Sequence, residues 1–233
     1  MSYYQLNAAA VTAPPPQLPV HQAHCGQFIS LQPLTDDPAC FEELYQRSHG
    51  DAVREAIWDY MPYGPFADAN TMRDYYLQMA TSGDPQFYIV QQNADGACTG
   101  IMSYLRMSPE AYTIEIGHIW HAAEYQRGRS NSEGSYLLTA NAFELGYRRM
   151  EWKCNALNQK SRQAALRLGF AFEGVFRQHI VFKGKNRDTA WFSIIDKDWQ
   201  QIQENFKQWF HADISTCSLA ALNRPVIEWS LPA

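Results

Sequence analysis

The sequence lacks the features of a membrane protein, a secreted protein or a nucleic-acid-binding protein. No stretch approaches the ~20 consecutive apolar residues that cross a bilayer, and no basic region followed by an apolar run marks a signal peptide. The 24 acidic residues outnumber the 19 Lys and Arg, so the net charge is −5 and the chain has no excess of cations for phosphates. We therefore expect a cytoplasmic protein with neither a nucleic acid nor a membrane as partner.

Cysteine is also scarce. The five cysteines are widely spaced, at positions 25, 40, 98, 154 and 217. No C-x-x-C pair occurs, and no histidine lies at zinc-ligand spacing from a cysteine pair, so we expect no metal site. An odd, scattered set predicts reduced thiols, each acting as a small core or surface residue.

The sequence does contain enough apolar material for one core. Hydrophobic residues make up 46% of the 233 positions and charged residues 18%, which is typical of one globular domain with tails. Residues 1–27 read as a Pro-rich tail, which we expect to be extended polyproline structure or disorder. Residues 28–199 are predicted to form the domain, and residues 200–233 the rest of a closing helix and an irregular tail.

Hydrophobic patterns predict a mixed sheet. Strands are expected at 28–34, 86–92, 97–107, 112–121, 150–155, 170–182 and 188–195, mainly from period-two alternation. Helices are expected after Asp37 and Asp68 and at 132–145, 159–168 and 199–209. Antiparallel strands followed by β–α–β units predict an α+β fold, with a mostly antiparallel central sheet and helices on both faces.

The richest segment, residues 125–133, follows a predicted strand and opens a helix. A helix N-terminus presents unpaired backbone N–H groups and a partial positive charge, which suits a pyrophosphate. Ser130 and Glu133 match the S-x-x-E capping box, and Arg127 and Arg129 offer donors to phosphate oxygens. The alternative is an ordinary capped helix with solvated arginines.

A second segment, residues 155–170, opens another helix. Asn158 is a natural N-cap, and Ser161 lies one turn into the helix at its open end. The helix ends at Leu168-Gly169-Phe170. By itself, this pattern also describes a plain amphipathic helix.

Together the two segments resemble the GNAT superfamily of acyl-CoA N-acyltransferases. The shared features are the strand, the phosphate-binding turn, the helix, the next strand, and then Asn158-x-x-Ser161 on a helix that ends in Leu-Gly-Phe. Residues 144–153, 174–177 and 187–195 and the aromatic loop 58–66 look like the RimJ/RimL-type branch. The resemblance covers roughly residues 28–199.

The resemblance implies a site for acetyl-CoA, or another short acyl-CoA, between two parallel strands that splay apart. The backbone before His121 would bond the pantetheine arm, the turn would hold the pyrophosphate, and Asn158 would contact pantetheine. The implied cofactor-binding residues are Ile119, Trp120, His121, Gln126, Arg127, Gly128, Arg129, Ser130, Asn131, Ser132, Asn155, Asn158, Ser161 and Arg162.

The resemblance also implies direct attack of an amine on the thioester, with the protein supplying orientation and an oxyanion donor. Ser161 stands where many relatives use a tyrosine acid, and we expect it to donate a hydrogen bond to the leaving sulfur. Glu115 and His118 are the candidates for a general base. The alternative for each is a half-exposed strand residue. We take Ser161, Asn158 and Glu115 as the candidate catalytic residues.

The acceptor is expected to be a protein N-terminus or a small-molecule amine. The resemblance places aromatic side chains around it, and we expect Trp58, Tyr60, Tyr63, Phe66 and His118 to line its pocket. Simple hydrophobic packing under the loop is the alternative. Basic residues in the pocket would instead favour a larger acyl group such as succinyl.

One departure from the family pattern leaves a non-catalytic alternative open. The usual turn is Q/R-x-x-G-x-G/A, and Arg129 and Asn131 stand where its glycines fall. Arginine adopts the left-handed region poorly. The chain is then either an N-acyltransferase or a module with the same fold that binds a CoA ester or a partner. A homodimer that packs Trp199, Trp209 and Trp229 across an interface is a further reading.

Overall fold

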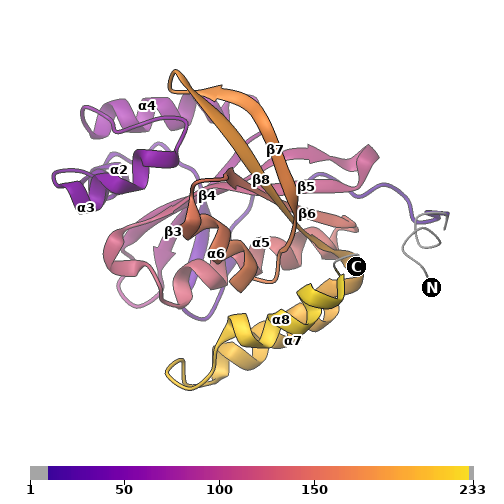
Figure 1. Cartoon of the computed structure of the whole chain (residues 1–233). Helices are drawn as coiled ribbons and strands as arrows, with labels where there is room; N and C mark the ends of the chain where they lie inside the picture. The colour runs from indigo at the N-terminus through magenta and orange to yellow at the C-terminus, as the bar shows by residue number, and fades with distance from the viewer. Residues whose placement is uncertain (1–9, 231–233) are drawn as a thin grey trace.

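The structure is a computed structural model that describes residues 10–230, with side chains as far as Ile227. Its centre is one eight-stranded sheet in the order β1-β2-β3-β4-β5-β6-β8-β7 (Figure 1). Neighbouring strands are antiparallel except for β5 and β6, which are parallel. This confirms the predicted α+β class, with its mostly antiparallel sheet and one parallel pair.

The strands are β1 His24–Cys25, β2 Ile29–Pro33, β3 Gln86–Gln92, β4 Cys98–Ser108, β5 Thr113–His121, β6 Arg149–Asn155, β7 Ala171–Phe182 and β8 Lys185–Ile195. The α-helices are α2 Pro38–Ser48, α3 Ala52–Glu55, α4 Ala69–Ala80, α5 Arg129–Glu144, α6 Gln159–Arg167, α7 Asp196–His211 and α8 Leu219–Ser230. Short 3-10 turns are η1 Ala56–Tyr60, η2 Pro109–Ala111 and η3 Ala123–Tyr125.

Each face of the sheet has its own hydrophobic core. Alternate residues of a strand point to opposite faces, so Ile114 and Ile116 join the core under α5 and α7, while Phe87 and Ile89 join the core under α2 and α4. The first core continues into α6 and α8, and Figure 1 shows α7 and α8 side by side below the sheet. Helices on both faces are thus confirmed.

The C-terminal segment is more ordered than the sequence predicts. Residues 219–230 form α8 instead of an irregular tail, and Pro225 within the helix explains why the pattern hid it. The buried side chain of Asn223 donates to the Arg167 carbonyl oxygen (3.0 Å) and accepts from Asn205 (3.0 Å), which ties α8 to α6 and α7.

The tryptophans of this region pack within the chain where the structure describes them. Trp199 stacks on Phe143, with 5.3 Å between ring centroids, and Trp209 packs on Phe210 at 5.7 Å. The side chain of Trp229 lies outside the described residues. An interface role for Trp199 and Trp209 is therefore not needed to explain their burial.

The Pro-rich arm lies along the domain rather than apart from it. Pro16 and Pro19 are buried, the Ala13 carbonyl oxygen accepts from Tyr112 (2.7 Å) and the Pro19 carbonyl oxygen from Gln86 (3.0 Å). β1 pairs with β2 at the end of the arm. The extended conformation agrees with the prediction, and disorder was wrong for residues 10–27. Domain boundaries at 27 and 199 stay predictions.

Glu133 fixes the end of this arm. Its carboxylate is buried and accepts three backbone N–H bonds, from Gln27 (2.6 Å), Phe28 (2.7 Å) and Ile29 (2.8 Å). The predicted capping box is therefore wrong. α5 begins at Arg129 with Gly128 as an N-cap that has no side-chain bond. Glu133 therefore lies inside the helix, and its carboxylate bonds to the backbone at the end of the arm.

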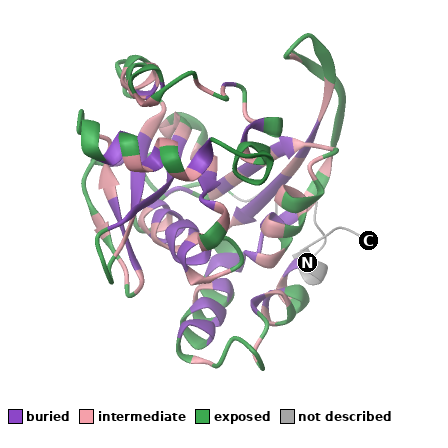
Figure 2. Ribbon diagram, turned by 90° about the vertical axis from the view of Figure 1, so that its left-hand side faces the viewer, coloured by how far each residue is buried: buried purple, intermediate pink, exposed green. Residues whose placement is uncertain are grey.

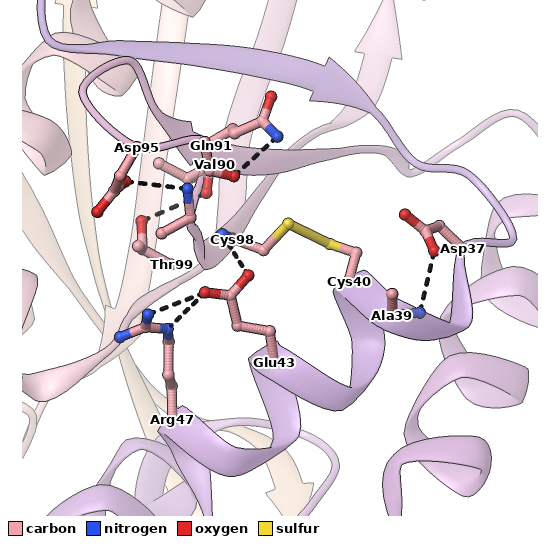
Figure 3. Close-up of a disulfide and its surroundings, with 12 residues drawn as sticks. Asp37, Ala39, Cys40, Glu43, Arg47, Val90, Gln91, Asp95, Cys98 and Thr99 are labelled. Carbon is pink, nitrogen blue, oxygen red and sulfur yellow. Dashed lines mark hydrogen bonds and ion pairs between the residues drawn. A yellow bond between two sulfur atoms is a disulfide. The ribbon is translucent and has the colours of Figure 1, made fainter.

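A disulfide joins Cys40 of α2 to Cys98 of β4 (Figure 3). The backbone N–H of Cys98 also donates to Glu43 of α2 (2.9 Å). The predicted reduced state is wrong for this pair, because the fold brings together two cysteines that are 58 residues apart. Cys25, Cys154 and Cys217 are free.

Replacement of Glu133 by Ala is expected to lower the free energy of unfolding by about 3 kcal/mol, because hydrogen bonds to a buried charged group are each stronger than average and three N–H donors lose their acceptor. Urea unfolding measures the change. Glu144→Ala, at an exposed position of the same helix, is the control and should change stability by less than about 0.5 kcal/mol. Equal effects of the two substitutions would contradict the anchoring role of Glu133.

Candidate active site

The parallel strands β5 and β6 pair over only three residues. Thr113, Ile114 and Glu115 lie opposite Arg149, Met150 and Glu151, and no pairing follows. β5 nevertheless continues to His121 and β6 to Asn155. From Gly117 onward, the edge of β5 that faces β6 therefore has backbone groups with no strand partner, and these are available to an extended ligand.

A β-bulge in β5 accompanies this splay. Ser103 lies opposite Gly117 and Ile101 opposite Trp120, so two residues of β5, His118 and Ile119, face one residue of β4. His118 has a left-handed φ of 51°. A bulge bends its strand and increases the twist, which carries the end of β5 away from β6. It also turns the side chain of His118 toward the α4 side, where it stacks on Tyr63.

The first turn of α5 lies directly after this strand. No side chain caps the helix, so its first backbone N–H groups keep the anion-binding character of a free helix N-terminus. Arg129 and Asn131 are helical here, and the left-handed residue of the turn is Arg127, with a φ of 63°. The two family glycine positions therefore need no glycine in this chain.

Not every predicted cofactor-binding side chain points to this turn. The guanidinium of Arg129 lies between the rings of Phe28 and Trp209 (5.1 and 5.7 Å to the centroids) and donates to the Ala212 carbonyl oxygen. Ser130 donates to Gln92 (3.1 Å). For these two residues, only the backbone N–H groups remain candidates for a phosphate.

A different cation reaches the first turn of α5. Arg167, at the end of α6, donates to the hydroxyl of Ser132 (2.6 Å), and burial lowers the pKa of its guanidinium. His121 lies nearby and is buried, and burial lowers its pKa to about 4. The carbonyl oxygen of His121 accepts from Gln126 (2.9 Å), which holds the turn against β5.

The start of α6 lies at the end of β6. Asn158 caps the helix through its side-chain oxygen, which accepts from the backbone N–H of Ser161 (3.1 Å), and this confirms the predicted N-cap. Asn155 accepts from the backbone N–H of Leu157 (2.9 Å). Arg162 donates to the Ala156 carbonyl oxygen (3.3 Å), which directs it along the same loop.

Ser161 has a defined hydrogen-bond donor. Its hydroxyl oxygen accepts from the indole N–H of Trp152 (3.0 Å), which leaves the hydroxyl proton available to another group. Ser161 also interacts with the Cys154 thiol, whose pKa is raised by burial and lowered in part by Ser161 and by Arg187. A hydroxyl that accepts from an N–H group becomes a stronger donor.

Glu115 is held between two cations. Its buried carboxylate pairs with Lys153 (2.8 Å) and Arg106 (2.7 Å), and Lys153 also pairs with Glu151 (2.8 Å). The pair of Lys153 with Glu115 joins β6 to β5 next to their last paired residues, and the pair of Arg106 with Glu115 joins β4 to β5. The role of Glu115 as general base stays a prediction.

The aromatic loop after η1 packs over the end of β5. The rings of Tyr63 and Phe66 both pack against Tyr76 of α4. Tyr63 also stacks on His118, with 5.6 Å between the ring centroids. Trp58 is fully buried, and its indole N–H donates to the Ser48 carbonyl oxygen (3.0 Å). Hydrophobic packing therefore accounts for the position of Trp58. Tyr63 and His118, in contrast, are joined by a hydrogen bond.

Two contacts join this loop to the opposite side of the splay. Tyr60 donates to the Leu157 carbonyl oxygen (3.4 Å). Lys183, at the tip of the β7–β8 hairpin, donates to the carbonyl oxygens of Trp58 (3.0 Å) and Gly64 (3.1 Å). Figure 2 shows the outer part of this hairpin as an exposed arm. The loop, the hairpin and the start of α6 thus surround the ends of β5 and β6.

The residues that the sequence did not single out are Tyr76, Arg106, Lys153 and Lys183. Tyr76 follows the helical spacing of a core residue, and Lys153 alternates with Trp152 and Cys154 as an ordinary strand residue would. Only the register of β5 against β6 shows that Lys153 meets Glu115.

Known proteins share this fold. A family model described as an acetyltransferase (GNAT) domain matches residues 29–171, more than half of the chain. The crystal structure of a GCN5-related N-acetyltransferase from Brucella melitensis has 32% sequence identity and a TM-score of 0.85, and the match covers 91% of this chain and 99% of that chain. A GNAT-family crystal structure from Chromobacterium violaceum ATCC 12472 has 36% identity and a TM-score of 0.75, over 82% of this chain and 95% of that chain.

A curated relative is YdaF of Bacillus subtilis (strain 168), which is named as a ribosomal N-acetyltransferase. It is 28% identical over 107 residues, which are 46% of this chain and 58% of that protein. The match thus spans less than two thirds of YdaF. It agrees with the RimJ/RimL-type branch that the motifs indicate.

Within residues 10–230, we find no helix with the length and apolar character needed to cross a membrane.

Replacement of Lys153 by Met is expected to cost about 3 kcal/mol of unfolding free energy, because it leaves the buried Glu115 and the half-buried Glu151 with one cation fewer. The double variant Lys153→Met, Glu115→Gln should recover part of this loss. Lys207→Met, in an exposed pair with Glu204, is the control, with an expected change below about 1 kcal/mol. Additive effects of the two buried substitutions, measured by urea unfolding, would refute the coupling.

The lowered pKa of His121, about 4 against an ordinary 6.5, predicts how stability depends on pH. The unfolded chain takes up this proton below pH 6.5 and the folded chain does not, so stability falls as the pH drops from about 6.5 to about 4. His121→Gln should lose less stability than the wild type between pH 7 and pH 5. The exposed His211→Gln should behave like the wild type, and a His121→Gln profile parallel to the wild type would contradict the assignment.

Proposed function

Because the chain belongs to the GNAT acetyltransferase family, we propose that it transfers an acetyl group from acetyl-CoA to a primary amine. The observation that carries the proposal is the separation of β5 from β6 beyond Glu115 and Glu151, beside the uncapped first turn of α5. An extended arm with an anionic end fits these two features, which offer unpaired strand backbone and a helix N-terminus.

Acetyl-CoA supplies an activated acyl group as a thioester when it is bound. In this proposal, the backbone of Ile119 to His121 orients its pantetheine arm, and the N–H groups from Gly128 to Ser132 hold its pyrophosphate. Arg127 is exposed at the turn, and Arg167 lies on Ser132 (2.6 Å). Both are placed to add positive charge near the phosphates.

Asn158 and Ser161 have separate roles. The side-chain oxygen of Asn158 is used by the helix cap, so its amide N–H groups are the ones left to donate to pantetheine. Ser161 accepts from Trp152 and so directs its proton elsewhere. We assign that proton to the leaving sulfur, where a hydrogen bond stabilises the developing negative charge.

The attacking amine must be neutral. Glu115 is paired with both Lys153 and Arg106, and we assign it the role of holding the strands at the splay. We propose that the amine loses its proton to solvent and that the site acts mainly by orienting the two reactants.

The acceptor is a primary amine on a protein N-terminus or on a small molecule. The first choice follows the name of YdaF, a ribosomal N-acetyltransferase, and in either case we expect the amine to enter beside loop 58–66 and the β7–β8 hairpin. The non-catalytic alternative depended on Arg129 and Asn131 in the phosphate turn. Since both residues are helical in α5, that alternative loses its support.

Calorimetric titration with acetyl-CoA tests the proposal first. The wild type should bind with a Kd in the micromolar range. Asn158→Ser keeps a capping oxygen but removes the amide, and binding should weaken about tenfold, the loss of one hydrogen bond to a ligand. Ser161→Ala should bind normally, with kcat for thiol release reduced about 100-fold.

Gln163→Ala, at an exposed position of α6, is the control and should match the wild type. If the wild type binds none of acetyl-CoA, succinyl-CoA and free CoA, the enzyme proposal fails. Tighter binding of succinyl-CoA would change the acyl group and leave the reaction class in place.

A further inference from the structure

A chain of four polar side chains crosses the aromatic cluster beside the splay. The indole N–H of Trp120 donates to the hydroxyl of Tyr76 (2.9 Å), Tyr76 donates to the hydroxyl of Tyr63 (3.2 Å), and the Tyr63 hydroxyl lies 3.1 Å from Nδ1 of His118. Trp120, Tyr76 and Tyr63 are buried. His118 is the other end of the chain, and its ring stacks on that of Tyr63 in loop 58–66.

The chain has a fixed direction because one end can only donate. An indole N–H has no acceptor capacity, so the Tyr76 oxygen accepts and its proton passes on to Tyr63. The Tyr63 oxygen then accepts in turn, and its own proton has His118 Nδ1 as its partner. In a neutral imidazole with Nδ1 as acceptor, the proton lies on Nε2.

The surroundings favour these neutral forms. Burial, with Arg106 nearby, lowers the pKa of His118 to about 4, and burial raises the pKa values of Tyr63 and Tyr76 above their ordinary value. The titratable and charged groups that face His118 are Tyr63 and Arg106. No carboxylate of a described residue pairs with it, so no neighbour stabilises an imidazolium.

The ring of His118 is also held in place. It stacks on Tyr63 with an interplanar angle of 15° and contacts Phe87, with 5.2 Å between centroids. The bulge places it on the face that α4 and loop 58–66 cover, whereas Ser161 bonds to Trp152 of the opposite core. Among the described residues, Tyr63 is its only hydrogen-bond partner.

We propose that Tyr63 is a positioning residue that fixes the tautomer of His118, and that His118 presents its Nε2–H as a hydrogen-bond donor to an oxygen atom of the acceptor molecule. The ligand in this inference rests on the proposed function. The acceptor amine uses its lone pair for attack, so the partner of Nε2–H is an oxygen beside that amine, in a carbonyl or carboxylate group. His118 therefore selects among amines and does not take their proton.

The tautomer can be measured without any activity. In a long-range ¹H–¹⁵N spectrum of the ¹⁵N-histidine-labelled full chain at pH 7, His118 should show a protonated Nε2 and an unprotonated Nδ1. His118→Gln assigns the signal by its disappearance. Tyr63→Phe, which keeps the stacked ring, should shift His118 toward a mixture of tautomers. A protonated Nδ1 in the wild type, or an unchanged spectrum in Tyr63→Phe, overturns the positioning role.

Kinetics with acetyl-CoA test the donor role. His118→Ala should raise KM for a carbonyl-bearing amine about tenfold, the loss of one hydrogen bond, with a smaller effect on an alkylamine. His118→Gln carries an amide N–H donor but no base, and should recover most of the lost affinity. The exposed His211→Gln is the control.

If Ala and Gln at position 118 lose kcat equally, and the acid limb of the pH–rate profile disappears in both, His118 is a base and the inference is wrong. If the wild type transfers no acetyl group, the proposed function fails, and the spectrum still decides the tautomer.

Discussion

The separation of β5 from β6 is the constraint on which the rest of the site depends. Two features act on it in opposite directions. The ion pair of Lys153 in β6 with Glu115 in β5 (2.8 Å) holds the strands together at their last paired residues, and the bulge at His118 and Ile119 turns β5 away directly afterwards. Gly100 of β4 permits the close approach of the β5 backbone at the bulge, because a Cβ at this position would overlap the carbonyl oxygen of Trp120. The opening therefore begins at a defined residue, with the α5 N-terminus and Ser161 around it.

Local patterns predicted the parts of the fold that depend on neighbours in sequence. The caps by Asp68 and Asn158 are confirmed (2.7 and 3.1 Å), because an Asx side chain reaches backbone two or three residues ahead. The errors concern partners that are far apart in sequence. Glu133 looked like a capping-box residue, but its buried carboxylate serves the N–H groups of residues 27–29. The disulfide between Cys40 and Cys98 has no local signal either.

The same division holds for the candidate site. The motifs indicated which two helices begin at the site, because their polarity and spacing are read within one turn. The start of α6 after Asn158 is confirmed, whereas α5 begins at Arg129, before the predicted position 132. The motifs did not indicate where long side chains point. The guanidinium of Arg129 points away from the phosphate turn and packs against Phe28 and Trp209. Arg167, at the far end of α6, instead bonds to the first turn of α5. Such exchanges depend on how α7 and α6 pack against α5, which one-dimensional periodicity does not contain.

The aromatic cluster shows why packing and chemistry are coupled at this end of the sheet. Tyr63 and Tyr76 fill the core under α4, and burying a phenol is tolerated only if its hydroxyl finds a partner. Each hydroxyl accepts from the group before it and donates to the group after it, in a series that runs from Trp120 to His118. The chain must end at a group that can accept without donating back, and a neutral imidazole nitrogen meets that condition. The hydrogen-bonding demand of a buried core thus dictates the state of His118, the side chain at which this series of hydrogen bonds ends.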